Sequence, residues 1–345
     1  MRTCTWAPTV FQGTQVVGGV RDRSTDAFPT GERLNQIVDV YVARVESLGI
    51  SHLLIAQRWW GSGSDIEGSS LDCLAMTAHI AARSKCLKLI TAIHPGFFSP
   101  AQIAKWGATL DRLNPGRWAI NLTSGWNLDE FSMYGVDALS HDERYARSDE
   151  FLTVLKAAWR GTPTDFDGRY YRTRDLVLEP KPVSALEIFQ GGQSPAAMAL
   201  AGKHSDTMFL NGGSLEKTEQ IIIRARQAAE RHDRRLSFAL YAAPLCRESD
   251  SEAWAEIDSR LARVDPGLVA RRKERVSGAE GMWAEDGDPL SVLDTNEGFA
   301  SRLIGAPDTI LARIREFQAI GVDMLHLDLS DELFNRAVLP SLQAL

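Results

Sequence analysis

The sequence has little of what several functional classes require. Cysteine is scarce, with four residues (Cys4, Cys73, Cys86 and Cys246) spread over 345 positions and no C-x-x-C pair. This argues against a zinc ribbon or a disulfide framework, and it is typical of a reducing cytoplasm, where we place the protein. No apolar run approaches the roughly 20 residues that a membrane-spanning helix needs. Residues 1–6 lack the apolar core of a signal peptide.

Basic residues are outnumbered. Lys and Arg total 38 against 45 Asp and Glu, which gives a formal net charge of −7, and no basic block occurs. Binding to a phosphate backbone needs a basic surface, so we do not expect nucleic acid as a partner. Neither H-E-x-x-H nor G-x-S-x-G is present, so metal-dependent hydrolysis and triad chemistry are not expected, and no metal site is predicted.

Short apolar runs alternate with helical periodicity along the whole chain. The expected strands lie at 10–12, 51–56, 87–93, 118–123, 187–190, 206–210, 236–245 and 322–329. The expected helices lie at 31–48, 71–83, 100–113, 145–159, from 195 onward, 215–232, 251–263 and 308–319. Near-continuous apolar strands are typical of a parallel sheet covered on both faces. Eight such units fit a (β/α)8 TIM barrel better than an open doubly wound sheet, so we predict one barrel domain over residues 1–345.

A plain barrel needs about 250 residues, so insertions must account for the excess. We expect them at about 127–186, where residues 166–171 suggest a strand with a turn, and at about 264–303. The stretch 275–295 is polar but carries Met282 and Trp283. We expect it to close over the site and exclude water, and a mobile surface loop is the alternative.

The turn after the expected strand at 187–190 has the clearest chemical content. Gly191 and Gly192 allow a close approach of the backbone to a ligand, Ser194 is a probable N-cap, and Pro195 occupies the first helical position. Phosphate binds well at such a helix N-terminus. A capped connection without any ligand explains the same residues equally well.

Two residues at the start of the helix near 145 could reach the same phosphate. Arg144 can bind it in bidentate fashion, and Tyr145 adds a hydroxyl. An ion pair between Glu130 and Arg144 is the alternative explanation.

Aromatic residues and histidines follow other expected strands. Trp59 and Trp126 suit the walls of a pocket for a flat or apolar ligand, although packing beneath the barrel loops is an alternative. His94 and His326 are the histidines at strand ends, where a structural role is more common than a catalytic one. We place Trp59, Trp126, Tyr241, Trp283 and His326 in a substrate pocket.

Several segments, in order, resemble the bacterial luciferase-like flavin monooxygenases. They are 121–131 (NLTSGWNLDEF), 141–145 (HDERY) with 150–151, 189–194 (FQGGQS) and 297–307 (EGFASRLIGAP). The resemblance spans essentially the whole chain. It is greatest to the FMNH2-dependent dimethylsulfone monooxygenases, and the alkanesulfonate and pyrimidine monooxygenases are more distant.

This resemblance implies a barrel that uses reduced FMN, supplied by a separate NAD(P)H:flavin reductase, together with O2 and a small organic substrate. It also implies a homodimer or homotetramer. By position, the residues that match flavin contacts of the pyrimidine-type members are Asn121, Glu130, Arg144, Tyr145 and Ser194, and those that match the contact after strand two are Ala56 and Gln57.

The chain departs from these relatives where a substrate would bind. Alkanesulfonate monooxygenases carry a cysteine after strand two, Arg-x-His on strand seven and a tyrosine near the last strand. Here those places hold 57–59 (QRW), 241–243 (YAA) and 327–329 (LDL), so a sulfonate substrate is not expected. Ile93-His94 replaces the usual leucine-arginine of strand three, and we predict that His94 and Arg58 stabilise an oxyanion during catalysis.

The sequence thus predicts a two-component FMNH2-dependent monooxygenase acting on a sulfone-like, other C–S, heterocyclic or halogenated compound. Two alternatives stay open: an F420-dependent enzyme that transfers hydride, and a flavin-binding protein without catalysis. A phosphosugar isomerase has no support, because no strand ends in a glutamate with a histidine partner.

Overall fold

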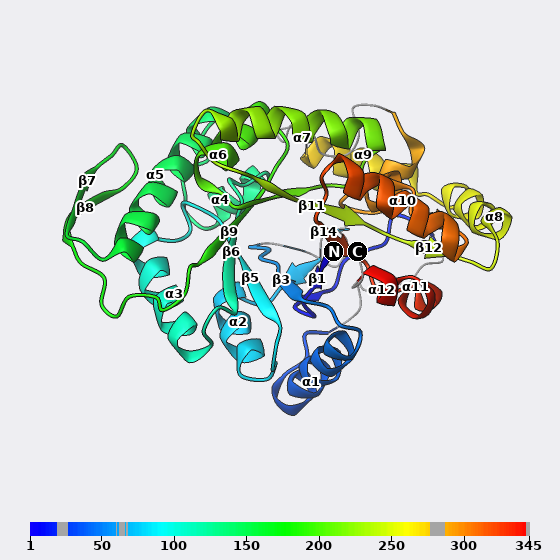
Figure 1. The fold of residues 1–345 in the computed structure, drawn as a ribbon, viewed down its shortest axis with the longest axis horizontal. Helices are drawn as coiled ribbons and strands as arrows, with labels where there is room; N and C mark the ends of the chain where they lie inside the picture. Colours follow the sequence, from blue (N-terminus) through cyan, green and yellow to red (C-terminus); the bar gives the residue numbers. More distant parts are fainter. Residues whose placement is uncertain (19–26, 60, 62–65, 67, 277–286, 343–345) are drawn as a thin grey trace.

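The computed structural model describes residues 1–18, 27–59, 61, 66, 68–276 and 287–342. Eight parallel strands close into a barrel in the order β1-β3-β5-β6-β9-β10-β11-β14 (Figure 1). Their bounds are β1 Arg2–Trp6, β3 His52–Ile55, β5 Lys88–Ile93, β6 Trp118–Leu122, β9 Glu187–Gly191, β10 Thr207–Leu210, β11 Ser237–Ala242 and β14 Met324–Leu327. The predicted (β/α)8 barrel is confirmed.

Helices connect the strands and cover the outside of the barrel (Figure 1). Those between successive barrel strands are α1 Gly31–Ser47, α2 Cys73–Ala81, α3 Pro100–Leu113, α5 His141–Arg160, α6 Pro195–His204, α7 Leu215–Glu230 and α10 Pro307–Ile320. After β14 the chain continues into α11 (Glu332–Ala337) and α12 (Leu339–Leu342). Helices were therefore predicted at the correct places between the strands.

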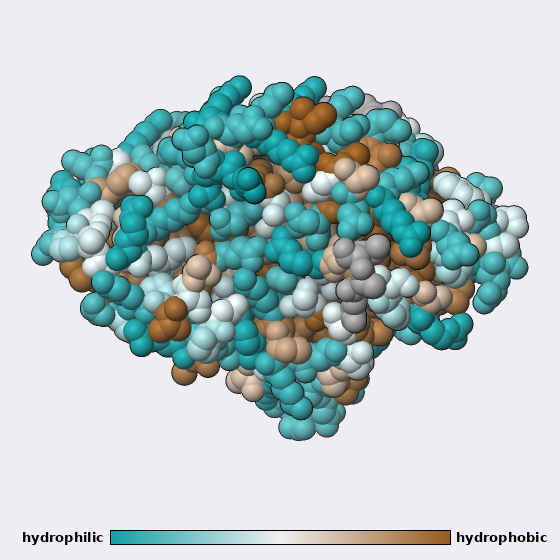
Figure 2. Space-filling view, in the orientation of Figure 1, coloured by the Kyte–Doolittle hydropathy of each residue, from teal (hydrophilic) through white to brown (hydrophobic). Residues whose placement is uncertain are grey.

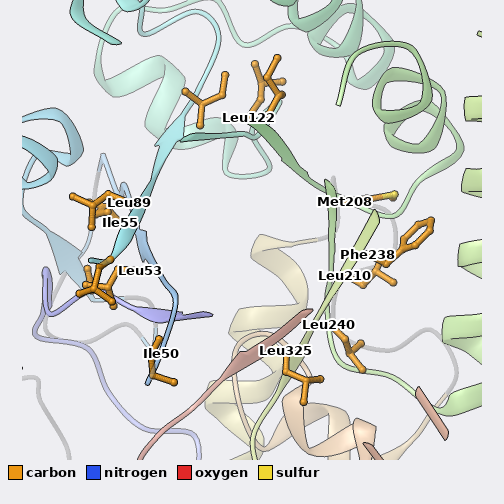
Figure 3. Packing of buried hydrophobic residues seen from close by; sticks show 14 of the residues in the cluster. Ile50, Leu53, Ile55, Leu89, Leu122, Met208, Leu210, Phe238, Leu240 and Leu325 are labelled. Carbon is orange, nitrogen blue, oxygen red and sulfur yellow. The ribbon is translucent and has the colours of Figure 1, made fainter. Parts of the chain in front are cut away.

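Strand alternation divides the hydrophobic core into two parts, because successive side chains of a strand point to opposite faces. Leu53, Met208 and Phe238 belong to the large cluster shared by the strands and the surrounding helices (Figure 3). Their neighbours Leu54 and Phe209 belong to a second cluster that fills the barrel interior. The barrel is therefore a packed core, and a ligand can enter only at one of its ends.

The predicted first strand at 10–12 is wrong. The first barrel strand is β1, and Val10–Phe11 forms a short strand, β2, that pairs with β4 (Ser69–Ser70) outside the barrel. Polar residues interrupt the apolar pattern of β1 because they bond inside the fold: the Thr5 hydroxyl donates to the Leu327 carbonyl at 2.8 Å.

The first predicted insertion, 127–186, needs a correction because α5 within it is a barrel helix. The additional elements are α4 (Leu128–Met133) and a hairpin of β7 (Thr164–Asp167) and β8 (Arg172–Leu176) at the edge of the molecule (Figure 1). The hairpin agrees with the strand and turn expected at 166–171.

The second predicted insertion lies between β11 and β14. The additional elements there are β12 Leu245–Cys246, α8 Asp250–Leu261, α9 Pro266–Arg275, η1 Pro289–Val292, η2 Gly298–Ser301 and β13 Ile304–Gly305. Residues 277–286, including Met282 and Trp283, lie outside the described part. The lid expected at 275–295 therefore stays a prediction.

Polar residues dominate the face of the molecule shown in Figure 2, and hydrophobic ones are scattered across it. Among the helices of the described ranges, none combines the length and the apolar character needed to cross a membrane.

Candidate active site at the C-terminal end of the barrel

A pocket opens at the C-terminal end of the barrel strands, as expected for this fold. Most of the predicted site residues line it: Ala56, Gln57, Arg58, His94, Asn121, Trp126, Arg144, Tyr145, Gly191, Gly192, Ser194, Tyr241 and His326. They come from the ends of six strands (β3, β5, β6, β9, β11 and β14) and from the start of α5. The structure therefore gathers into one cavity residues that lie 270 positions apart in the chain.

One wall of the pocket is the turn from β9 into α6. The Ser194 hydroxyl accepts a hydrogen bond from the Ala197 N–H at 3.2 Å and so caps α6, whose N-terminus faces the pocket. Gly192 has φ +116°, and a Cβ there would stand 3.0 Å from the Tyr145 hydroxyl. A Cβ on Gly191 would lie 3.6 Å from the Thr123 hydroxyl, its nearest non-adjacent neighbour among the described residues, so that position leaves room for a ligand.

Arg144 faces this turn from α5. A capping box formed by Ser140 and Glu143 fixes the start of the helix. Arg144 is buried, its Nε donates to the Gly125 carbonyl at 3.1 Å, and one Nη donates to the Leu139 carbonyl at 2.8 Å. Burial lowers the pKa of Arg144, yet an arginine remains charged at neutral pH.

This guanidinium makes no ion pair with any residue in the described ranges, so the alternative of a Glu130–Arg144 pair is wrong. A buried cation without a carboxylate is costly unless an anion neutralises it. Arg144, the α6 N-terminus and the adjacent glycines together provide what a phosphate group needs.

Two buried amides in the same pocket also lack partners within the described residues. They are Oδ1 of Asn121, on β6, and Nε2 of Gln193, in the glycine turn. Buried polar atoms are nearly always hydrogen-bonded, so these two indicate groups that a ligand would satisfy. The residues present fit a flat, phosphate-bearing cofactor such as FMN.

The inner end of the pocket is aromatic. The His326 ring lies 4.4 Å from Trp6, 5.2 Å from Tyr241 and 5.5 Å from Phe209, measured between ring centroids. Burial lowers the pKa of His326 to about 3, so the ring is neutral, and its Nε2 has no partner in the described part of the chain. This end suits an uncharged, compact molecule.

His94 lies at the end of β5 and is buried. Burial, and then the charge of Arg58, lower its pKa to about 4. The indole N–H of Trp59 donates to Nδ1 of His94 at 3.1 Å. Trp59, predicted for the substrate pocket, is not among the residues that line this cavity: its ring stacks on Phe97 with centroids 4.3 Å apart.

Other predicted residues have structural partners of their own. The Gln57 carbonyl oxygen accepts from the Cys73 N–H at 2.8 Å, and its amide donates to the Arg58 carbonyl, so this side chain holds the start of α2. The guanidinium of Arg58 lies 5.9 Å from the Trp126 ring, and that of Arg272 on α9 lies 4.6 Å from the same ring. The second insertion therefore packs against the rim of the pocket.

Two predicted residues are not seen at the pocket. Glu130 is buried on α4 and is not among the lining residues, because α4 turns Glu130 and Phe131 inward. Trp283 lies outside the described residues. The sequence reasoning missed Trp6, Phe209 and Asn296, which do line the pocket. Had the first barrel strand been predicted at 2–6, Trp6 would have been a candidate site residue, because it is the last residue of that strand.

The closed parallel barrel with a pocket at the C-terminal end of its strands has the architecture of a TIM-barrel enzyme. The chain belongs to the luciferase-like monooxygenase family, whose profile matches residues 1–324.

Curated relatives and solved structures agree with this assignment. The chain is 36% identical to an FMNH(2)-dependent dimethylsulfone monooxygenase of Pseudomonas putida, over 99% of this chain and 94% of that protein. It is 35% identical to the enzyme of the same description from Pseudomonas fluorescens (strain Pf0-1), with the same coverage. Among solved structures, DmoA from Hyphomicrobium sulfonivorans superimposes with a TM-score of 0.75 at 19% identity, covering 100% of this chain and 88% of that one. This last similarity concerns the fold.

Proposed function

We propose that the protein is a two-component FMNH2-dependent monooxygenase that oxygenates a small, uncharged organic molecule. One observation carries the proposal: the buried guanidinium of Arg144, which forms no ion pair with the described residues, lies in the same pocket as the glycine turn at the N-terminus of α6. This is the pattern of a phosphate site. The FMNH2 dependence of relatives at 35–36% identity supports FMN as its ligand.

In this proposal Gly191, Gly192 and Ser194 contribute backbone and helix-terminal N–H groups to the phosphate, and Arg144 and Tyr145 approach it from α5. Asn121, Ala56 and Gln57 border the flavin ring system. Glu130, predicted as a direct flavin contact, instead acts indirectly in this proposal, through its position on α4. Reduced FMN, when bound, supplies the electrons that activate molecular oxygen.

The protein's own part is to bind, orient and exclude water. Trp6, Phe209 and Tyr241 form an aromatic wall around His326. The neutral His326 ring can donate one hydrogen bond to a substrate or accept one from it. Arg58 and His94 also line the pocket, and in this proposal they stabilise negative charge on oxygen. These surroundings favour a sulfone-like molecule, or another C–S, heterocyclic or halogenated compound, over a sulfonate.

A separate NAD(P)H:flavin reductase would deliver FMNH2, because the chain has no G-x-G-x-x-G nicotinamide fingerprint. A supply that depends on NAD(P)H fits a cytoplasmic enzyme. By likeness to the family, the working form is a homodimer or homotetramer.

The test is an anaerobic titration with FMNH2, followed by admission of oxygen and mass analysis of candidate sulfones, heterocycles and halogenated aromatics. We expect saturable binding of FMNH2 and an oxygenated product. Flavin binding without turnover of any candidate would favour a non-catalytic flavin protein, and preference for F420 over FMN would favour a hydride-transferring enzyme.

The two-component nature has its own test. We expect no product from NADH and oxidised FMN alone, and product once a flavin reductase is added. Turnover driven by NADH without a reductase would contradict the proposal.

A further inference from the structure

Trp59 contacts His94 by a bond whose direction is fixed by chemistry. The indole nitrogen of Trp59 lies 3.1 Å from Nδ1 of His94. An indole N–H can only donate a hydrogen bond. Nδ1 must therefore be the unprotonated, accepting nitrogen of the imidazole.

The other nitrogen of the ring then carries the proton. His94 is buried and lines the pocket, whereas Trp59 is not among the pocket-lining residues. The edge of the ring that carries Nε2 is thus the one left for the pocket. Burial, followed by the charge of Arg58, lowers the pKa of His94 to about 4, so the ring is neutral at physiological pH and has a definite tautomer.

The indole itself is held firmly. Its ring stacks on Phe97 with centroids 4.3 Å apart and planes 8° apart. The centroid of the tilted Phe98 ring lies 5.4 Å away, and that of Tyr134, in an edge-to-face arrangement, lies 5.1 Å away. Such packing fixes the direction of the N–H. The aromatic packing around Trp59 therefore bears on the orientation and the tautomer of His94, to which the indole N–H donates.

We infer that Trp59 is a positioning residue that locks His94 in the Nε2–H tautomer and so presents a fixed, neutral hydrogen-bond donor to the pocket. A donor of this kind selects an oxygen acceptor without requiring the acceptor to be charged. The identity of the acceptor rests on the function proposed above: it is either a flavin carbonyl or an oxygen of the substrate. The tautomer itself does not depend on that proposal.

The direct test is nitrogen-15 NMR of the protein without ligand at neutral pH, with the His94 signals assigned by their loss in His94→Gln. We expect Nδ1 to resonate as an acceptor nitrogen and Nε2 as a protonated one. We also expect a scalar coupling through the hydrogen bond between Nε1 of Trp59 and Nδ1 of His94. A charged ring, or a proton on Nδ1, would overturn the inference whatever the function of the protein.

Trp59→Phe keeps the stacked ring and removes the N–H. We expect its His94 signals to shift toward a mixture of the two tautomers. The matched control is Tyr134→Phe, which alters the same aromatic cluster at an exposed position but leaves the N–H in place, and there the His94 signals should stay as in the wild type. Unchanged signals in folded Trp59→Phe would show that Trp59 does not set the tautomer. If this variant does not fold, the coupling in the wild type decides.

Two binding measurements then identify the acceptor. If Nε2–H bonds to flavin, Trp59→Phe should weaken FMNH2 binding by about three- to tenfold, the scale of one neutral hydrogen bond. If it bonds to substrate oxygen, FMNH2 affinity should stay constant and KM should rise by a similar factor. If a variant with mixed tautomers keeps both its FMNH2 affinity and its KM, the donor role is refuted while the proposed function stays intact.

Discussion

The two ends of the barrel treat charge in opposite ways. At the N-terminal end, Arg2 pairs with Glu187 at 3.0 Å and with Asp323 at 2.7 Å, and Lys88 pairs with Glu187 at 2.8 Å. At the C-terminal end, the more deeply buried Arg144 has only backbone carbonyls as partners within the described residues.

Buried polar atoms without a partner among the described residues occur in the C-terminal pocket and also elsewhere in the fold, for example at Asn335. The described residues with unsatisfied buried atoms include Asn121, Gln193 and His326, all of them in the C-terminal pocket. A closed set of ion pairs contributes to stability and has nothing left to offer a ligand. Buried polar groups without hydrogen-bond partners cost stability. They are typical of binding sites, where a bound ligand supplies the missing partners.

The largest effect should follow from removing Arg144, the buried cation that has no ion-pair partner among the described residues. We expect Arg144→Ala to weaken FMNH2 binding by about 1.5–3 kcal/mol, roughly 10- to 150-fold in Kd, the scale of hydrogen bonds to a charged group. Anaerobic titration measures it. Arg2→Ala, at the other end, is the control and should leave Kd unchanged. A change in Kd within about twofold for Arg144→Ala would remove the basis for the phosphate site.

The opposite end should respond in stability and not in binding. Burial alone would raise the pKa of Glu187, but the hydrogen bonds and charges of Lys88 and Arg2 outweigh it and lower the pKa. We expect Glu187→Gln to lower the free energy of unfolding by about 1–3 kcal/mol. A carboxylate whose pKa is lowered in the fold stabilises the protein at any pH above its pKa in the unfolded chain. The loss of stability in Glu187→Gln should therefore be largest at neutral pH and shrink on acidification. Urea unfolding at several pH values measures it, and a reduced FMNH2 affinity in this variant would contradict the division between the two ends.

Two adjacent glycines give a finer test of the C-terminal end. Gly191→Ala meets no protein atom closer than 3.6 Å, so we expect native stability with FMNH2 binding weakened by about 1 kcal/mol through contact with the ligand. Gly192→Ala has a strained φ of +116° and should lower stability as well. Thermal unfolding and titration of both variants separate these effects. Full FMNH2 affinity in Gly191→Ala would mean that no ligand approaches the turn closely.

The effect that is smallest near neutral pH, and that grows on acidification, is the pH dependence of stability. Burial lowers the pKa of His326 to about 3, and burial with Arg58 lowers that of His94 to about 4, whereas both rise to about 6.5 in the unfolded chain. The unfolded state therefore binds more protons, and stability should fall as pH decreases below about 6.5. We expect His326→Phe to flatten this slope in unfolding experiments. A slope equal to that of the wild type would mean that His326 is protonated in the fold.

Much of the architecture could be predicted because it depends on local pattern. The apolar runs marked every barrel strand after the first, since buried parallel strands need continuous hydrophobic residues. The glycine turn and its N-cap were also predictable, because Gly191, Gly192, Ser194 and Pro195 carry their backbone preferences with them. From the spacing of these units, the barrel and the end that carries the site both followed.

Other features depend on contacts between distant parts of the chain, and only the tertiary structure decided them. β1 was missed because its polar residues are satisfied by partners distant in the chain: Thr3 by Ser51, and Thr5 by the Leu327 carbonyl on β14. Trp59 and Trp126 both follow strands, yet one packs behind His94 and the other lines the pocket. The sequence determined which residues stand at the ends of the strands. Closure of the barrel determined which of them meet, because a side chain's partners depend on non-local packing that no local pattern encodes.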